Sequence, residues 1–438
     1  MTKTSPPDQP RYKNTPDQPR NTETADQMKN TETSDQPHYS YRNNLDPASY
    51  DEFVKNHPQA NLLQSASWGK IKDTWGHRLV GLVNEQEEIV AAGLLLLRPV
   101  KFGWTVWYMP HGPILDYENK EIVSLFFSSL QKDARKQKCA FIKIDPPVFA
   151  AKSLYADFTD GVSPEAQIAK ANLEQVGFRH QGFSKNMQDT IQPRYHAITF
   201  ADDRPLEDRI SKRSRSALKD SRKRQVQVIR GTVQDLDDFY YLIQKTEAAK
   251  DINLRNQAYF RKLMEVYGDD AFLYLAIIDL KEAIAKHESM KVDVQERMAA
   301  LPPNAPKKRL EYENRLASYE KLLNIFQDMR KKEGDKAILA GCLSVLYGPS
   351  FEMLYAGFNR DYAFIPAQDP VYIASMQAAF AQGAKYASMG GVEGDLQDSL
   401  MEYKNHFDPH VVAFLGEFDL PINKLLYQAY LLLRKLKK

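Results

Sequence analysis

The sequence predicts an α+β fold built from two similar units that follow one another along the chain. Three observations lead to this prediction. The chain has 438 residues, more than one compact core usually contains. Helical and strand patterns alternate along it, with hairpins among the strands. The order of elements before residue 200 partly recurs after residue 201, although the residues themselves do not.

Residues 1–43 differ from the rest of the chain in composition. They repeat related segments: PDQPRYKNT, PDQPRNTET, ADQMKNTET and SDQPHYSYR. Segments rich in Asp, Gln, Pro, Asn and Thr bury too little apolar surface to offset the entropy lost on ordering. We therefore expect a disordered tail, to which the sequence assigns no function.

The first unit is predicted over residues 44–200. It begins with a helix at 46–57, for which Asp46 or Ser49 is a suitable N-cap. The next elements are a helix at 65–76, strands at 78–83 and 89–100, a strand that ends in the proline-broken loop of 104–115, an amphipathic helix at 121–137, a buried strand at 139–145, a helix at 171–178 and a strand at 190–200.

The second unit is predicted over residues 201–280 and 334–420. Its elements are a basic helix at 213–224, a strand at 226–230, helices at 235–249 and 256–267, strands at 271–280, 338–348 and 351–358, a helix at 370–384 and a strand at 386–392. Residues 421–438 form a last helix that we expect to pack on the first unit. Its basic end suits the helix dipole, or alternatively an anionic lipid surface.

Residues 281–333 interrupt the second unit. They are charged and helical on both sides of the segment LPPNAP. Apolar residues recur at helical spacing in each arm: Ile284, Met290, Val294 and Met298 in the first, and Leu316, Tyr319, Leu323 and Phe326 in the second. This pattern predicts an antiparallel helical hairpin, or coiled-coil arm, about 35 Å long. It is either a structural insertion or an arm that contacts a large partner.

Composition excludes several classes of function. The net charge is +2, so the overall balance gives no indication of nucleic-acid binding. Cys139 and Cys342 are far apart in apolar contexts, which is typical of buried thiols in a reducing compartment. No apolar run is long enough to span a bilayer, and no secretory signal is present, so we expect a cytoplasmic protein. Motifs for a serine hydrolase, a zinc protease or a phosphate-binding loop are absent, and no metal or cofactor is expected.

The remaining candidate chemistry is cationic and aromatic. Lys70 and Lys72 stand beside Trp68, and Arg255 precedes Tyr259 by one helical turn. Cations with aromatic walls suit a phosphate group. Each residue alone is more typical of a surface charge above an apolar stem.

A denser basic run lies between residues 204 and 224. Its spacing fits a helix that is charged on most sides: Arg209, Lys212, Arg213, Arg215, Lys219, Arg222, Lys223 and Arg224. Such a helix either binds a nucleic-acid backbone or is simply solvated.

Six segments, in order, resemble the FemABX aminoacyltransferases: LLQSASWGKIKDTWG, FIKIDPPV, TIQPR, LYAGFNRDY, GGVEGDLQDSLMEYKNHF and LGEFDLPIN. The resemblance covers residues 45–438. It implies two GNAT-like domains, acetyltransferase-like in fold. It also implies transfer of an amino acid (Gly, Ala or Ser) from aminoacyl-tRNA to the stem-peptide lysine, or the growing bridge, of lipid II. The implied contacts are aminoacyl-tRNA, lipid II and the inner face of the cytoplasmic membrane.

The resemblance also implies roles for individual residues. Lys404 corresponds to the lysine next to the transfer centre, and Tyr403 stands where some relatives carry Phe. The implied substrate-binding residues are Lys70 or Lys72 with Arg255 for phosphate, Tyr259 beside them, and Tyr355 and Asp145 along the peptide channel. The basic helix then supplies tRNA contacts through Lys212, Arg215, Lys219 and Arg222.

The chemistry of an aminoacyl ester fits such a site. A fixed cation such as Lys404 stabilises charge on the carbonyl oxygen or the leaving ribose hydroxyl, and Asp145 is a candidate base for the attacking amine. Two alternatives stay open. One is a GNAT-type acyltransferase that uses acyl-CoA, against which the missing R/QxxGxG/A loop counts. The other is a non-catalytic protein that binds tRNA or membranes.

Overall fold

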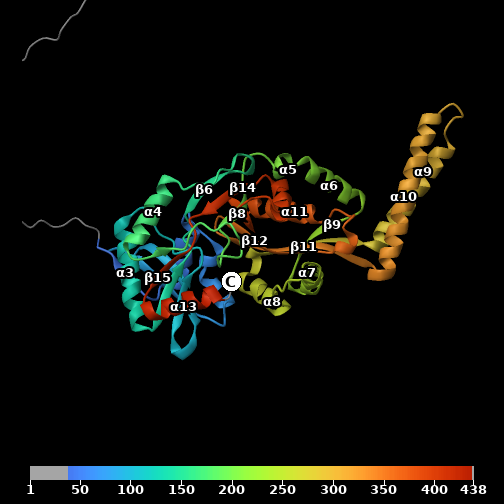
Figure 1. Cartoon of the computed structure of the whole chain (residues 1–438). Helices are drawn as coiled ribbons and strands as arrows, with labels where there is room; N and C mark the ends of the chain where they lie inside the picture. The colour runs from blue at the N-terminus through green and yellow to red at the C-terminus, as the bar shows by residue number, and fades with distance from the viewer. Residues whose placement is uncertain (1–37, 437–438) are drawn as a thin grey trace, which may run out of the picture. The chain divides into compact units, whose positions relative to one another are not determined.

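The computed structural model describes residues 38–436, and two sheets form the body of this part of the chain (Figure 1). The first sheet contains, in spatial order, β1 (Ser40–Arg42), β2 (Gly76–Val83), β3 (Ile89–Pro99), β4 (Thr105–Met109), β5 (Cys139–Ile144), β15 (Phe418–Pro421) and β7 (Arg179–His180). The second contains β6 (Phe149–Leu154), β14 (His410–Phe414), β8 (Tyr195–Phe200), β13 (Tyr386–Val392), β12 (Ser350–Phe358), β11 (Lys336–Tyr347), β10 (Ala271–Asp279) and β9 (Gln227–Gly231).

Both sheets are mostly antiparallel, and each includes a parallel pair, β4 with β5 and β12 with β13. The predicted α+β class is confirmed, and the strands of this part of the chain form two sheets. The helices are α1 (Pro47–Asn56), α2 (Ala66–Ile71), α3 (Lys120–Lys136), α4 (Pro164–Gln175), α5 (Leu206–Arg209), α6 (Lys212–Lys223), α7 (Leu236–Lys250), α8 (Gln257–Tyr267), α9 (Leu280–Ala299), α10 (Pro306–Glu333), α11 (Gln368–Ala381), α12 (Ser399–Lys404) and α13 (Lys424–Leu436).

Capping side chains set where the helices begin. The Asp46 carboxylate accepts hydrogen bonds from the backbone N–H groups of Ala48 and Ser49, and Pro47 occupies the first position of α1. These contacts satisfy donors that a helix start otherwise leaves unpaired. Of the two predicted caps of this helix, Asp46 is the one that acts.

The two sheets exchange strands. β6 and β8 lie in the range predicted for the first unit but pair in the second sheet, each next to β14. The chain then crosses back, because β15 follows β14 after three residues and joins β5 in the first sheet. The predicted domain boundary at residue 200 stays a prediction. Strand pairing does not follow this boundary, because strands from before residue 200 are found in both sheets. The site described below lies where these strands cross.

One apolar cluster joins the two sheets. Leu94 of β3 and Leu275 of β10 belong to it, together with Tyr50 of α1 and Phe239 of α7, and all four are fully buried. A core shared between both sheets makes independent movement of the two units costly. The groups contributed by each unit are therefore held in fixed positions.

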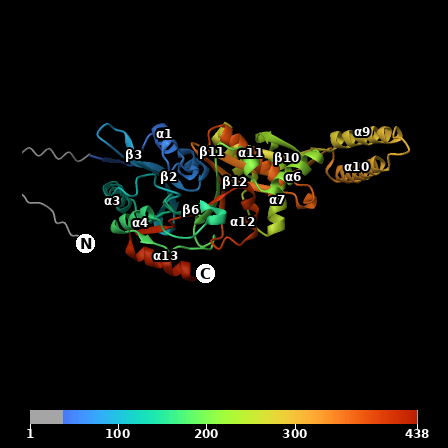
Figure 2. The ribbon, with the colours of Figure 1, turned by 90° about the horizontal axis from the view of Figure 1, so that it is seen from above.

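Helices α9 and α10 occupy the region of the predicted hairpin and extend together away from both sheets (Figures 1 and 2). The Lys291 ammonium lies 2.9 Å from the Glu320 carboxylate, and the His287 ring contacts Phe326. Leu323 and Phe326 are buried in the seam as the apolar pattern indicates. His287 is also buried there, although the apolar pattern does not include it.

Two terminal predictions have different outcomes. Most of the predicted tail lies outside the described residues, but Ser40–Arg42 are not disordered, because they pair with β2 as strand β1. At the other end, α13 packs against β5 of the first sheet through rings. Tyr427 and Tyr430 lie 5.3 and 4.6 Å from Phe141 between ring centroids.

Candidate active site

Lys404 is the last residue of α12, and its amine is buried. The side chain of Asp398 caps this short helix by accepting from the Met401 N–H. Lys404 is 4% exposed, and its Nζ donates to the carbonyl oxygens of Gly390 and Gly391 at 3.1 and 2.7 Å. The register of β13 shifts here, and Gly390 has a φ of +77° that other residues rarely adopt. The bulge thus leaves two carbonyls free to hold the lysine.

The surroundings of Lys404 weaken its charge. The pKa of Lys404 is lowered to about 7, mainly by burial; the Asp398 carboxylate opposes this shift and the Lys250 ammonium adds to it. An amine with this pKa is partly neutral at pH 7, and an anion placed next to it favours the charged form. The position is suited to an anion or a developing negative charge.

One buried histidine, His196, lies near this lysine, and a second, His111, packs against it. In the sheet, His196 of β8 is opposite Gly391, and its ring lies 5.6 Å from that of His111 between centroids. Within residues 38–436, Nε2 of His196 and Nδ1 of His111 have no hydrogen-bond partner. Burial lowers the pKa of His111 to about 4 and that of His196 well below its usual value, with His111 and Lys404 contributing to the latter. Both rings are therefore neutral near pH 7, and the lowered pKa makes each a weak base.

Asp145 follows β5 and lies on the other side of His111. Its carboxylate accepts from the Tyr108 hydroxyl at 3.0 Å and from the backbone N–H of His111 at 2.8 Å. Burial, with a further contribution from the Glu417 carboxylate, raises the pKa of Asp145 well above its usual value. Both oxygens are thus used to hold the Tyr108–His111 segment. Asp145 forms no hydrogen bond with Lys404, and the contacts that link the two residues run through His111 and His196.

A cavity of about 450 Å³ opens beside His196. The second sheet supplies much of its wall, including Lys152, Phe414 and Glu352, and the loop of residues 58–61 after α1 supplies another part. Burial lowers the pKa of Lys152 and raises that of Glu352. The cavity therefore combines aromatic walls with polar groups that are easily charged or neutralised, which is typical of a small-molecule or peptide site.

A second cationic group lies between α2 and α8. The Arg255 guanidinium lies 5.2 Å from the centre of the Tyr259 ring, and the Lys72 amine lies 5.3 Å from the Trp68 ring. Burial and the proximity of Arg255 lower the pKa of Lys72. Among the described residues, neither cation has a carboxylate partner. Two neighbouring cations without carboxylate partners suit an anion, and we call this pair the anion site. Lys70 and Arg255 are both exposed, and Lys72 is the lysine that lies near Arg255.

The two predicted tyrosines of the substrate site have different surroundings. The Tyr355 hydroxyl donates to the Tyr259 hydroxyl at 3.3 Å, so these two rings form a wall next to Arg255. Tyr403 faces the core of the second unit, where its ring lies 5.5 Å from Tyr372 and 5.3 Å from Phe407. Its place beside Lys404 in the sequence does not bring its ring to the Lys404 amine.

Comparison with known proteins identifies the family. The model described as the FemAB family matches residues 45–435. The chain belongs to the FemAB family. Similar FemAB proteins include the lipid II:glycine glycyltransferases of Staphylococcus aureus strains MSSA476 and USA300. Each is 29% identical, with 86% of this chain and 92% of the relative covered. The crystal structure of FemX is similar at a TM-score of 0.76 and 27% identity, covering 89% of this chain and 99% of FemX.

The basic helix of this FemAB-family protein is not charged on most sides, contrary to the sequence prediction. Ser214, Leu218 and Ser221 form a buried face of α6, which packs on α11. The basic side chains of α6 differ in exposure and in their interaction partners. Lys212 and Lys219 are exposed, Arg222 is 3.8 Å from the Glu207 carboxylate, and Arg215 donates to the Asp208 carbonyl. The exposed cations all lie on the outer face of α6.

Sequence reasoning missed His111 and His196 in this FemAB-family site. Neither residue belongs to a motif from which the sequence predicts chemistry. A usable signal existed, because His196 lies in the segment TIQPRYHAITF that includes a family-like motif. Within the described residues, no group of three or more potential ligands is placed to hold a metal, and no helix is long and apolar enough to cross a membrane.

Proposed function

We propose that this protein is an aminoacyltransferase that moves Gly, Ala or Ser from aminoacyl-tRNA to a lipid-linked peptidoglycan precursor. The acceptor is the side-chain amine of the stem-peptide lysine or the end of the growing bridge. The observation that carries the proposal is the buried Lys404 amine near the neutral imidazole of His196, which lines a cavity. Membership of the FemAB family and the lipid II:glycine glycyltransferases among its relatives support it.

The anion site between α2 and α8 is assigned to the precursor. Arg255 and Lys72 bind its phosphates, and Tyr259 and Tyr355 form the wall beside them. Fixing the phosphates limits where the peptide that hangs from them can reach, which lowers the entropy cost of bringing its amine to the ester. Lys72 is favoured over Lys70 for this role because it lies near Arg255.

The chemical step needs a cation and a proton acceptor. The neutral acceptor amine attacks the ester carbonyl, the N–C bond forms, and the Lys404 ammonium stabilises the negative oxygen or the departing ribose oxygen. The amine then loses a proton and the ribose oxygen gains one. His196 is the proposed relay for this proton, since its Nε2 has no partner among the described residues. Its lowered pKa makes it a weak base, so a proton that it accepts is readily passed on.

Asp145 remains a candidate base, but its contacts favour a positioning role. Its two oxygens already accept hydrogen bonds from Tyr108 and His111. By holding the backbone of His111, it fixes the ring that packs on His196. The outer face of α6, with Lys212, Lys219 and Arg222, is the proposed contact for the tRNA backbone, with Arg215 next to it.

Transfer of a radiolabelled amino acid from charged tRNA to lipid II tests the proposal. The assay should use the full chain and separate tRNAs charged with Gly, Ala and Ser. Labelled lipid product from at least one of them supports the proposal. Product from acyl-CoA with none from tRNA would identify a GNAT-type acyltransferase, and retention of tRNA without transfer would identify a binding protein.

The anion site gives a prediction about precursor binding. Arg255→Ala and Lys72→Met are each expected to raise KM for the precursor by about tenfold to a hundredfold with little change in kcat, because each removes a charge-assisted contact to phosphate. The double variant should raise KM by less than the product of the two single increases, since both cations bind the same anion. Lys70→Met is the matched control and should change KM less than about twofold.

The pKa of Lys404 gives a prediction about pH. At low pH the Lys404 amine is charged, and the neutral fraction of an acceptor lysine grows tenfold per pH unit towards its pKa of about 10.4. Above about pH 7 the loss of the Lys404 charge offsets this gain. A plot of log kcat/KM against pH should therefore rise with a slope of about one and flatten near pH 7. A slope that continues unchanged to about pH 9 would contradict the assigned role.

A further inference from the structure

Large apolar side chains are exposed together on two elements of the first unit. Phe102 is 92% exposed, and Leu425 and Leu436 are 83% and 82% exposed. We call the full set the apolar rim: Val100, Phe102, Leu425, Leu432, Leu433 and Leu436. Scattered exposed leucines are ordinary, but several on adjacent elements mark a surface that is covered in use.

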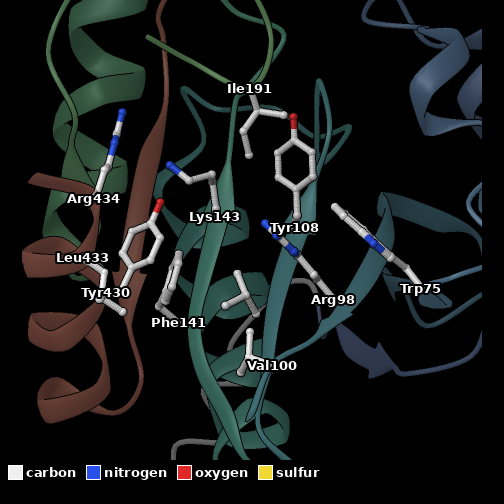
Figure 3. Close-up of a pocket in the computed structure, with 11 residues that line it drawn as sticks. Trp75, Arg98, Val100, Tyr108, Phe141, Lys143, Ile191, Tyr430, Leu433 and Arg434 are labelled. Atoms are coloured by element: carbon white, nitrogen blue, oxygen red, sulfur yellow. The ribbon is translucent and has the colours of Figure 1, made fainter. Parts of the chain in front are cut away.

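The two elements that carry the apolar rim are adjacent in space. Val100, in the loop between β3 and β4, and Leu433 of α13 line the same cavity of about 540 Å³. Figure 3 shows this cavity, with Phe141 between the Val100 side and the α13 side. The loop tip and the helix therefore form one continuous surface around the mouth of the cavity.

Helix α13 is apolar on two faces. Its inner face holds Tyr427 and Tyr430 against Phe141. Leu425, Leu432 and Leu436 are spaced by seven and four residues, so they lie along a single stripe on the outer face. A helix that only had to cover β5 would carry polar residues on that stripe.

The loop tip holds Phe102 outward at a cost in backbone energy. Phe102 has a φ of +62°, in the left-handed region that non-glycine residues seldom adopt, and Gly103 follows with a φ of +72°. A strained backbone with an aromatic ring directed into solvent gains no packing within the described residues. Such strain is usually retained at functional sites.

Basic side chains accompany the apolar rim. Arg98 and Arg434 line the cavity from opposite sides in Figure 3, and Lys101 and Lys424 are exposed beside the loop tip and at the start of α13. Apolar groups that enter the acyl region, flanked by cations that contact headgroup phosphates, are the pattern of a protein that lies on an anionic bilayer.

We propose that the apolar rim and its flanking cations bind the surface of an anionic phospholipid bilayer. This inference rests on the proposed function for its biological purpose. It deepens that function because it names the surface that contacts the membrane in which the precursor lies. The basic residues favour a lipid surface over a second copy of the chain, which would bring these like charges together.

Flotation with lipid vesicles tests the proposal without tRNA or lipid II. The full chain is expected to float with vesicles of phosphatidylcholine and about 30% phosphatidylglycerol, more weakly as salt rises, and poorly with pure phosphatidylcholine. A variant with Phe102→Ser, Leu425→Gln, Leu432→Gln and Leu436→Gln should bind at least about tenfold more weakly. The matched control, Val292→Gln with Leu310→Gln, alters exposed apolar residues of the helical hairpin and should bind as the unaltered chain does.

Two outcomes would overturn the proposal: equal vesicle binding by the unaltered chain and the rim variant, or self-association by sedimentation that the rim variant abolishes while neither form binds vesicles. Circular dichroism and thermal unfolding should first establish that the variant is folded. Transfer to a water-soluble precursor without the lipid chain separates this proposal from the proposed function. If the rim variant loses vesicle binding but still transfers the amino acid to the soluble precursor, the result bears only on the membrane-binding surface. If the unaltered chain shows no transfer, the result contradicts only the proposed enzymatic function.

Discussion

Replacing Lys404 with Met is expected to lower kcat by about a hundredfold to a thousandfold while KM for the precursor changes little. Met has a similar length and no charge, so the variant loses the cation that we propose stabilises the reacting ester. Removal of one group that stabilises a developing oxyanion typically costs this much. The effect falls on kcat because the negative charge exists in the transition state and not in the bound substrate.

Steady-state kinetics with lipid II and a charged tRNA measure this effect. Lys250→Met is the control, because Lys250 is exposed and only influences the pKa of Lys404. It should change kcat less than about threefold. The carbonyls of Gly390 and Gly391 lose their donor in Lys404→Met, so thermal unfolding must be compared as well. Equal effects on kcat and on precursor KM in a folded variant would contradict the assigned role.

The sequence led to Lys404 through a motif, but not to its environment. Nothing in the segment EYKNHF indicates that the amine is buried or that two carbonyls hold it. That arrangement depends on a register shift in β13 and on the positive φ of Gly390, fourteen positions earlier in the chain. Local pattern predicts a strand there, whereas a bulge is set by how neighbouring strands pair.

The histidines were missed for a topological reason. His111 follows β4 of the first sheet and His196 lies in β8 of the second, and their contact exists because strands cross between the sheets. The order of elements along the chain predicted two consecutive units. It does not indicate which of the two sheets each strand joins. By contrast, the contact between Arg255 and Tyr259 was predicted from a spacing of four residues, because it is local. The predicted shared helix face was wrong, since Arg255 precedes Asn256, the N-cap of α8, but its guanidinium still contacts the Tyr259 ring.

The other large effect is expected on stability, in Lys143→Met. The Lys143 amine is 2.8 Å from the Glu417 carboxylate and 2.7 Å from that of Asp419, and the three side chains are at most 3% exposed. Glu417 also accepts from the Ile191 N–H, and Asp419 accepts from the Tyr427 hydroxyl. Removing the cation leaves two buried carboxylates without it, which should lower the free energy of unfolding by about 3–5 kcal/mol. Urea denaturation of the variant and the unaltered chain measures the loss.

A charge-free triple variant, Lys143→Met with Glu417→Gln and Asp419→Asn, distinguishes loss of the cation from loss of packing. It should recover most of the stability, because no uncompensated charge remains in the interior. Acidity gives a second check. Burial outweighs the attraction of Lys143 and raises the pKa of Asp419 even in the unaltered protein. Without the cation the pKa of Asp419 rises further, so the variant's loss of stability should shrink as pH falls and grow as pH rises. A deficit that is independent of pH and persists in the triple variant would mean that the Lys143 stem stabilises β5 by packing and that its charge does not.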